Sequence, residues 1–455
     1  MKFPGDQRTT ADTGDGSPDH SVEPARSALR AVHDERNTHG SDTARTPFQR
    51  APFDDARLGA CVHCGLCLEA CPTYLVTGSE AESPRGRLHL MRALTDGRLE
   101  VDAAVRHHFD ACLGCRACES ACPSGVEYGA LIEAARPWLE SSRPWPARQA
   151  RRLLGRLLST RWPRELGWTL ISRLAGHPRV DRLARRLGSL GLARLAALDP
   201  LPRPELAEIF EPVGAARGEA LLLTGCVADT AFRGTALRAA RLLALAGVRV
   251  LVPAGQGCCG ALSLHLGDTA AAERDLDRLL KSIGRPDCDW IVPMAAGCGA
   301  HLREAAHRRP GEPTIAAFSE RVIDPLSLLA RLGLPSPQRR LEAEVAIHEP
   351  CHLIHAQGVS AEVHQLLAAI PGLSLVPLSE SEVCCGSAGT YNLTERDLSR
   401  RLLERKLDNV ATSGVTIVVA ANPGCLLQMR SGAIAADLDT EILHPLDLLA
   451  RVHAI

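Results

Sequence analysis

Two stretches of the chain repeat one cysteine pattern, Cys-x₂-Cys-x₂-Cys-x₃-Cys-Pro. The copies are Cys61, Cys64, Cys67, Cys71 and Pro72, then Cys112, Cys115, Cys118, Cys122 and Pro123. Three thiolates at this spacing can surround one face of an iron–sulfur cube, and the fourth, held by a proline turn, can complete the cluster of the other copy. We therefore predict two [4Fe–4S] clusters. Their predicted ligands are Cys61, Cys64, Cys67 and Cys122 for one, and Cys112, Cys115, Cys118 and Cys71 for the other.

Structural zinc is the alternative use for these thiols. Zinc sites take separated Cys-x₂₋₄-Cys pairs in a tetrahedral arrangement. Here three thiols follow one another and Cys-Pro closes the run. The spacing therefore favours iron–sulfur clusters over zinc.

Eight more cysteines form a second, duplicated pattern. Each copy has one cysteine, a Cys-Cys pair and one more: Cys226, Cys258, Cys259 and Cys298, then Cys351, Cys384, Cys385 and Cys425. Counterparts are 125, 126, 126 and 127 residues apart, which indicates an internal repeat. We predict that these thiols bind a cofactor, and a further iron–sulfur cluster is one option because four thiols suffice. The alternative is buried reduced cysteine acting as a small apolar residue, the role expected for the unmatched Cys288.

Buried strands precede the repeat cysteines. We expect strands at 219–225, 248–253 and 289–293, then at 345–348, 373–376 and 415–419, with helices between them such as 237–246 and 398–410. Alternating strands and helices predict parallel sheets covered on both faces. Ligands of such sheets gather at the carboxyl ends of the strands. The cysteines of each repeat should therefore lie together.

The predicted fold class is α+β and multidomain: a helical, ferredoxin-like bis-[4Fe–4S] module, then two duplicated α/β Cys-Cys-Gly domains with parallel sheets. The predicted segments are a disordered extension 1–50, the cluster module 51–140, a basic helical linker 141–215, and the two repeats 216–335 and 340–455. The arginines of the linker have two interpretations. They form a surface that docks a partner subunit or an anionic membrane, or they form a solvated helical face, and the solvated face is slightly favoured.

Composition limits the setting and the partners. A formal net charge of −1 gives no general attraction to nucleic acid. We find no run of 18 apolar residues for a transmembrane segment and no apolar leader for secretion. Thiols that bind clusters must stay reduced, so we expect a cytoplasmic protein, with peripheral contact at the inner face of the plasma membrane as an option.

Several histidines lie near the repeat cysteines. His348, His352 and His355 surround Cys351, and His265 and His301 follow the motifs of the first repeat. Such histidines can donate hydrogen bonds to cluster sulfurs or relay protons. Ordinary core or surface histidines are the expected interpretation.

The order of these motifs resembles the iron–sulfur subunit of bacterial glycolate oxidase (glycolate dehydrogenase). The likeness covers residues 55–455 and rests on both cluster motifs, the Ser83-Pro84-Arg85-Gly86-Arg87 turn and Cys384-Cys385-Gly386-Ser387-Ala388-Gly389-Thr390-Tyr391. It also extends to lactate-utilisation proteins, the small subunit of anaerobic glycerol-3-phosphate dehydrogenase and heterodisulfide reductase. Heterodisulfide reductase domains end in Cys-x-x-Cys, whereas Cys298 and Cys425 stand alone here, which disfavours disulfide reduction.

The resemblance implies an electron-transfer subunit of an oxidoreductase that acts on the CH–OH group of a 2-hydroxy acid. Flavin-containing subunits would oxidise glycolate to glyoxylate, and electrons would leave toward a downstream acceptor such as the quinone pool. No flavin is expected on this chain, because its only dinucleotide-like pattern, at residues 255–260, is not retained in the second repeat.

Overall fold

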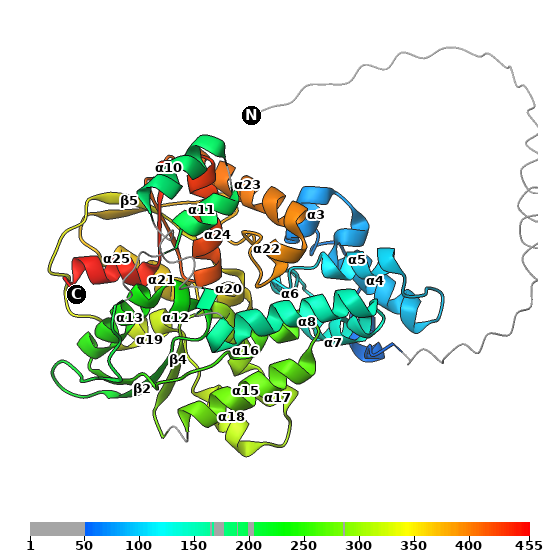
Figure 1. The fold of residues 1–455 in the computed structure, drawn as a ribbon, viewed down its shortest axis with the longest axis horizontal. Coiled ribbons are helices and arrows are strands. Elements are labelled where there is room, and N and C mark those ends of the chain that lie inside the picture. The colour runs from blue at the N-terminus through cyan, green and yellow to red at the C-terminus, as the bar shows by residue number, and fades with distance from the viewer. Residues whose placement is uncertain (1–50, 164–165, 168–176, 189, 199–203, 285–286) are drawn as a thin grey trace, which may run out of the picture. The chain divides into compact units, whose positions relative to one another are not determined.

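The computed structural model describes residues 51–163, 166–167, 177–188, 190–198, 204–284 and 287–455. The chain divides into two units, residues 1–50 and 51–455. The first unit, including its predicted disorder, lies outside the described residues. Everything below concerns the second unit (Figure 1).

Short helices build the N-terminal module. They are α2 (Asp55–Gly59), α3 (Pro72–Thr77), the 3₁₀ helix η1 (Glu80–Glu82), α4 (Pro84–Thr95), α5 (Ala103–Asp110), α6 (Ala117–Ser120) and α7 (Tyr128–Ser141). Both Pro72 and Pro84 occupy first helical positions, where a missing N–H costs nothing. Met91, Phe109 and Leu131 form the centre of the module's own core. The cysteine motifs lie in the loops that this core holds in place.

The described part of the predicted linker includes the helices α8 (Trp145–Ser159), α10 (Pro178–Leu187) and α11 (Leu190–Ala196). Some of their arginines pair with acids elsewhere in the chain. Arg151 pairs with Glu140 at 3.1 Å, and Arg185 pairs with Asp437 at 3.1 Å. Part of the basic face therefore fastens the linker to the rest of the fold.

The first repeat contains a four-stranded sheet in the order β1-β3-β2-β4. Its strands are β1 (Ile209–Phe210), β2 (Gly218–Leu223), β3 (Val248–Leu251) and β4 (Trp290–Pro293). The sheet is parallel as predicted except at β1, which pairs antiparallel with β3. This short edge strand comes from the predicted linker, and antiparallel edge strands are common on otherwise parallel sheets.

The second repeat contains an entirely parallel sheet in the order β6-β5-β7-β8. Its strands are β5 (Ala343–His348), β6 (Leu373–Val376), β7 (Ile417–Ala420) and β8 (Glu441–Leu443). One strand of each sheet is absent from the sequence prediction, β1 in the first repeat and β8 in the second. These strands have only two and three residues. The segment boundaries proposed from the sequence stay a prediction.

Helices cover both sheets. In the first repeat they are α12 (Val227–Ala231), α13 (Arg233–Leu245), α14 (Ala261–His265), α15 (Thr269–Ile283), α16 (Ala296–Arg303), α17 (Ala305–Arg308), α18 (Pro313–Glu320) and α19 (Pro325–Leu332). In the second they are α20 (Cys351–Gln357), α21 (Ala361–Ala368), α22 (Tyr391–Thr394), α23 (Arg396–Ser413), α24 (Pro423–Ala435) and α25 (Pro445–Val452).

One apolar core joins the two repeats. Leu222 of β2 and Ile347 of β5 both belong to it, together with residues of α13, α19, α21 and α25. Because strand side chains alternate between faces, the neighbouring residues Leu223 and His348 lie on the opposite faces of their sheets. Those opposite faces carry the repeat cysteines.

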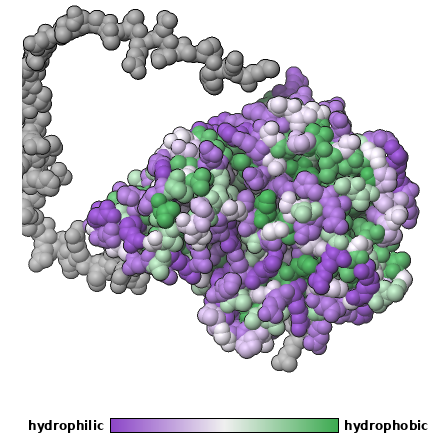
Figure 2. Space-filling view, turned by 180° about the vertical axis from the view of Figure 1, so that it is seen from behind, coloured by the Kyte–Doolittle hydropathy of each residue, from purple (hydrophilic) through white to green (hydrophobic). Residues whose placement is uncertain are grey.

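The exterior mixes polar and apolar residues. On the face shown in Figure 2, hydrophilic and hydrophobic patches alternate over the surface. Within the described ranges, no helix combines the length and apolar character needed to cross a bilayer.

Candidate metal centres

The first cavity of the N-terminal module brings three cysteines of one motif together with two of the other. Its lining includes Cys61, Cys64 and Cys67 together with Cys122 and Cys118. Cys64 is exposed and Cys61 and Cys67 are partly buried, so this cavity lies near solvent. The grouping is the crosswise one that the spacing predicts, and ligation itself stays a prediction.

A second cavity shows the reverse combination. Cys71 from the first motif lies with Cys112, Cys115 and Cys118 in its lining. Cys71, Cys112 and Cys118 are 6%, 7% and 8% exposed, so this group is shielded from water. Cys118 contributes to the lining of both cavities, which places the two cysteine groups next to each other.

The two cysteine loops have the same backbone shape. His63 and Gly65 of the first loop have φ of 57° and 86°, and their counterparts Gly114 and Arg116 have φ of 67° and 65°. Left-handed residues at these positions curl the chain and turn successive thiols inward. A non-glycine residue there is unusual, so the surrounding structure must hold His63 and Arg116 in place.

An arginine fastens each loop. Arg85 donates to the His63 carbonyl at 3.2 Å, and Arg136 donates to the Cys112 carbonyl at 2.9 Å. Added Cβ atoms on Gly65 and Gly114 would lie 3.0 Å and 3.3 Å from these guanidinium groups. Both loops therefore leave room for an arginine against their backbone.

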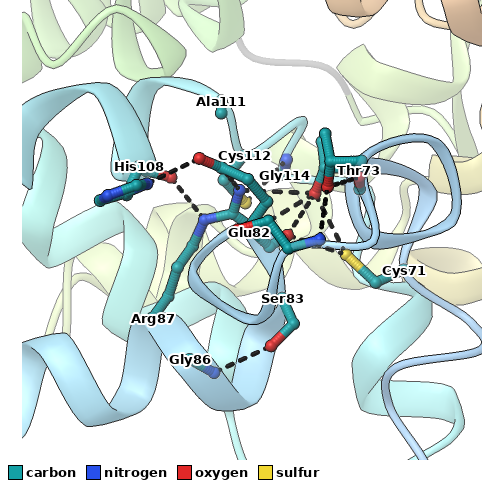
Figure 3. Close-up of polar contacts among 12 residues, drawn as sticks. Cys71, Thr73, Glu82, Ser83, Gly86, Arg87, His108, Ala111, Cys112 and Gly114 are labelled. Atoms are coloured by element: carbon teal, nitrogen blue, oxygen red, sulfur yellow. Dashed lines mark hydrogen bonds and ion pairs between the residues drawn. The ribbon is translucent and has the colours of Figure 1, made fainter. Parts of the chain in front are cut away.

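Arg87 is buried beside the second cavity, with 1% exposure (Figure 3). It pairs with Glu82 at 2.7 Å and donates to the His108 carbonyl. Burial lowers its pKa, but Tyr128, Cys112, Cys71 and Glu82 raise it more, so the guanidinium keeps its charge. A fixed positive charge beside a thiol group favours the thiolate form that binds metal.

The donor set of both cavities fits the predicted clusters. Cysteines from both motifs line each cavity, five in the first and four in the second, with Cys118 shared. Thiolates are the usual ligands of a [4Fe–4S] cluster. Among the described residues no carboxylate takes part in either lining. The residues present therefore match iron–sulfur ligation.

The first repeat also brings its four cysteines together. Cys226 Sγ lies 3.9 Å from Cys258 Sγ, and Cys259 Sγ lies 3.1 Å from Cys298 Sγ. The Cys226 contact lowers the pKa of Cys258, but Cys259 and burial raise it more. Metal binding at Cys258 therefore has to displace a proton from its thiol. Cys288 packs in one apolar cluster with Cys259 and Cys298, in agreement with a structural role.

The second repeat groups its cysteines in the same order. Cys384 contacts Cys351 and Cys385, and Cys385 contacts Cys425. The sequence predicts only an ordinary core or surface histidine at His348. In the structure, a ring nitrogen of His348 lies with the sulfurs of Cys385 and Cys425, all within 4.8 Å of one another. The sequence feature that could have indicated this is the position of His348, at the end of a predicted strand and three residues before Cys351.

Three other histidines near the repeats each have a partner at one ring nitrogen. His352 Nε2 lies 3.0 Å from the Gly114 carbonyl, and His355 Nδ1 lies 2.9 Å from Ser120 Oγ. His265 Nδ1 lies 2.9 Å from Arg136 Nη1. Burial, followed by Arg308, lowers the pKa of His301 to about 3, so this imidazole is neutral. These four resemble ordinary, partnered or neutral core histidines, as expected from the sequence.

The second cysteine loop of the module reaches the repeats. Arg116 pairs with Glu304 of the first repeat. Cys115 and Cys351 of the second repeat pack against the same apolar cluster, which includes Cys384. Burial and then Cys351 raise the pKa of Cys115. The more buried cavity therefore adjoins the cysteine group of the second repeat.

Comparison with known protein families agrees with this architecture. Residues 57–126 match the 4Fe-4S dicluster domain. Residues 220–303 and 345–430 each match the cysteine-rich domain called CCG. The chain therefore carries a module for two [4Fe–4S] clusters, followed by two cysteine-rich domains.

Individual proteins match most of the chain. The glycolate oxidase iron–sulfur subunit of Escherichia coli is 34% identical, and the match covers 84% of this chain and 92% of the relative. A probable glycolate oxidase iron–sulfur subunit of Bacillus subtilis is 32% identical, covering 87% and 94%. One of the subunits of a fumarate reductase (CoM/CoB) from Methanothermobacter marburgensis is 24% identical, covering 88% and 73%.

Proposed function

The chain belongs to the family of glycolate oxidase iron–sulfur subunits, and on this premise we propose that it carries electrons away from a flavin-containing subunit that oxidises glycolate to glyoxylate. It would thus be one part of an oxidoreductase acting on the CH–OH group of a 2-hydroxy acid, with the substrate site on the partner. No flavin would bind to this chain.

The observation that carries this proposal is the pair of adjacent crosswise cysteine groups. We assign Cys61, Cys64, Cys67 and Cys122 to one [4Fe–4S] cluster, and Cys112, Cys115, Cys118 and Cys71 to the other. Such clusters, when bound, take up and release single electrons. Cys64 is exposed, whereas Cys71 and Cys112 are buried. The first site is therefore open to a partner and the second is protected.

The surface beside the exposed site supports docking of a partner. Val62 and Leu66 alternate with the cysteines of the first loop and are 66% and 58% exposed. Apolar side chains held out on a rigid loop suit a protein interface. We propose that the flavin-containing subunit docks here, close to the Cys61 loop.

The repeats would extend the cofactor content. We propose that Cys226, Cys258, Cys259 and Cys298, and Cys351, Cys384, Cys385 and Cys425, bind a cofactor in each repeat. Cys351 adjoins Cys115, so the second repeat is suited to receive electrons from the buried site. A downstream acceptor, for which we propose the quinone pool, would then be reached from a cytoplasmic protein held at the inner face of the plasma membrane.

A heterodisulfide-reductase-like activity is less well supported. It would require a reactive thiolate that a disulfide substrate can reach. Cys258, Cys259, Cys384 and Cys385 are only 1–4% exposed. The pKa of Cys385 is raised, because Cys425 and burial outweigh the effect of its contact with Cys384. These thiols suit cofactor binding better than attack on a substrate.

The test is substrate-dependent reduction of the anaerobically purified chain. With a glycolate-oxidising flavin subunit, glycolate should bleach the visible cluster absorption and produce reduced-cluster EPR signals, with about eight irons in the module. Lactate and glycerol 3-phosphate, each with its own flavin enzyme, test the alternative complexes. Reduction by one of these but not by glycolate would contradict the proposal.

A further inference from the structure

The two repeats share their cysteines but differ in one residue beside them. Leu223 ends β2 opposite Pro293, and His348 ends β5 opposite Ala420. In the first repeat, Leu223 packs in an apolar cluster with Cys259 and Cys298. The corresponding place in the second repeat holds an imidazole.

His348 is buried on the cysteine side of its sheet. It is 1% exposed, and its neighbour Ile347 enters the core shared by the two repeats. One of its ring nitrogens, Cys385 Sγ and Cys425 Sγ lie within 4.8 Å of one another. The three side chains thus converge, although they come from the end of β5, the loop after β6 and the first turn of α24.

Neither ring nitrogen of His348 has a hydrogen-bond partner among the residues that the structure describes. The Ser381 carbonyl is close enough to raise the imidazole pKa, which burial and Lys406 lower, but it does not meet hydrogen-bond geometry. Burying a polar group without a partner is unfavourable, because the group loses its hydrogen bonds to water. A ligand that accepts one nitrogen would remove this cost.

We propose that His348, Cys385 and Cys425 bind one metal atom, so that the second repeat holds a mixed nitrogen–sulfur centre that the first repeat cannot form. Metal–nitrogen and metal–sulfur bonds of about 2.0–2.3 Å place tetrahedral ligand atoms roughly 3.3–3.8 Å apart. The 4.8 Å limit on the three atoms agrees with this geometry after a small inward movement. Zinc and iron are the metals that such ligands select.

The surroundings of the three ligands also differ from those of the first repeat. Asn422 Nδ2 donates to Cys425 Sγ at 3.4 Å, as a partner of a metal ligand would. Gly260 packs against Ala272 and Gly386 packs against Ser399, so α15 and α23 correspond with a shift of 127 residues. That shift matches Leu279 of the first repeat to Lys406 of the second.

Lys406 is 1% exposed, and its ammonium donates to the Glu380 and Ser381 carbonyls. Burial lowers its pKa to about 8, against the opposing effect of Cys385, Cys384, Glu380 and Cys425. A buried cation beside several thiolates offsets their negative charge. The second repeat is thus equipped for a charged metal centre, whereas the first repeat has Leu279 at this place.

This inference rests on the proposed function only in taking Cys385 and Cys425 as metal ligands. The experiment uses the full chain purified without oxygen, and counts iron and zinc per chain. For iron, nitrogen ligation is measured as ¹⁴N hyperfine coupling in pulsed EPR. For zinc, it is measured as nitrogen scattering in the extended X-ray absorption fine structure. All predicted ligands of the N-terminal module are sulfur, so a nitrogen signal has to come from elsewhere.

The variants are His348→Leu, which installs the residue of the first repeat, His348→Cys, and His307→Leu as the control that removes an exposed imidazole. We expect His348→Leu to lose about one metal atom per chain and the nitrogen signal. His348→Cys should keep the metal and lose only the nitrogen signal. The control should match the wild type in both measurements.

Unchanged metal content and an unchanged nitrogen signal in His348→Leu would overturn the inference. Should that variant not fold, His348→Cys decides, because a nitrogen signal that survives there cannot come from His348. The EPR signals of the N-terminal module serve as an internal standard. If the wild type lacked these signals, the proposed function would be contradicted, but the effect of the His348 substitutions on the nitrogen signal could still be measured.

Discussion

The Tyr391 hydroxyl donates a 2.9 Å hydrogen bond to the Ala111 carbonyl. Ala111 directly precedes the second cysteine motif, and Tyr391 follows the Cys-Cys-Gly motif of the second repeat. The bond is buried and joins residues 280 positions apart. It therefore fixes the Cys112 loop against the second repeat, where the two cysteine groups adjoin.

Tyr391→Phe removes this bond and leaves the buried Ala111 carbonyl without its partner. We expect the free energy of unfolding to fall by about 1–3 kcal/mol. Anaerobic denaturant titration followed by circular dichroism measures this change. Tyr74→Phe, at a half-buried position on α3, is the control and should change it by less than about 0.5 kcal/mol. Equal effects of the two substitutions would mean that the Tyr391 contact is not special.

Cys71→Ser should damage the cluster of the other motif. Cys71 lines the cavity of Cys112, Cys115 and Cys118, so its loss leaves that site with three thiols. We expect iron content to fall toward about four atoms, with the remaining reduced EPR signal free of cluster–cluster interaction.

The matched variant Cys122→Ser should spare the buried cluster and damage the exposed one. The two remaining signals should differ in how fast external ferricyanide oxidises them, because Cys64 is exposed. If Cys71→Ser instead removed the more accessible cluster, the crosswise assignment would be wrong.

Local sequence predicted most of the strands because each is a short apolar run followed by a cysteine-bearing turn. The structure has β2 (Gly218–Leu223), β4 (Trp290–Pro293) and β6 (Leu373–Val376) close to the predicted ranges. The antiparallel edge strand β1 could not be predicted, since its pairing with β3 depends on distant packing. A run of two residues carries no periodicity.

The sequence also indicated which cysteines act as groups, through their spacing and their duplication. It could not show that Cys115 lies beside Cys351, because nothing local encodes how the module packs on the second repeat. For the same reason the sequence predicts only an ordinary core or surface histidine at His348. The folded chain shows that its nitrogens lack hydrogen-bond partners among the described residues and that one of them lies near two thiols.

Arg87→Met should destabilise the chain strongly. The substitution removes the 2.7 Å guanidinium partner of Glu82, which is 5% exposed, and leaves this carboxylate with only the His108 ring nitrogen at 2.6 Å. Breaking a buried ion pair costs about 3–5 kcal/mol. Arg85→Met is the control, because its pair with Glu80 is much more exposed and should be worth no more than about 1 kcal/mol. Adding Glu82→Gln to Arg87→Met should recover much of the loss.

Denaturant midpoints of the four proteins, wild type included, measure these effects. If Arg85→Met were as damaging as Arg87→Met, burial would not explain the difference. If the double variant were no better than Arg87→Met, the uncompensated Glu82 charge would not be the cause.

Gly260→Ala and Gly257→Ala should behave oppositely, although they lie three residues apart. Gly260 has φ of 98°, and an added Cβ would lie 2.5 Å from the Ala272 carbonyl oxygen. An added Cβ on Gly257 meets nothing within 4 Å. Gly260→Ala should therefore yield little folded protein, whereas Gly257→Ala should purify and unfold like the wild type. A dinucleotide-binding loop would instead be sensitive at Gly257, where the backbone approaches the phosphates.

Asp324 gives the first repeat a pH-dependent stability. Burial raises its pKa from 3.8 to about 7, against the opposing hydrogen bond from the Leu326 N–H. Between these values the folded state keeps the proton and the unfolded state has lost it. Stability should therefore fall as pH rises from about 4 to 7, by up to roughly 1.4 kcal/mol per pH unit, and level off above pH 7.

Asp324→Asn is neutral at every pH and keeps the oxygen that caps α19. We expect it to be more stable than the wild type at pH 8, with the advantage shrinking steadily toward pH 5, because protonation relieves the buried charge only in the wild type. Anaerobic denaturant titrations at pH 5, 6, 7 and 8 measure the difference. Asp102→Asn, at the exposed cap of α5, is the control and should show no such trend. An Asp324→Asn advantage that stayed constant with pH would show that the effect comes from packing and not from the charge.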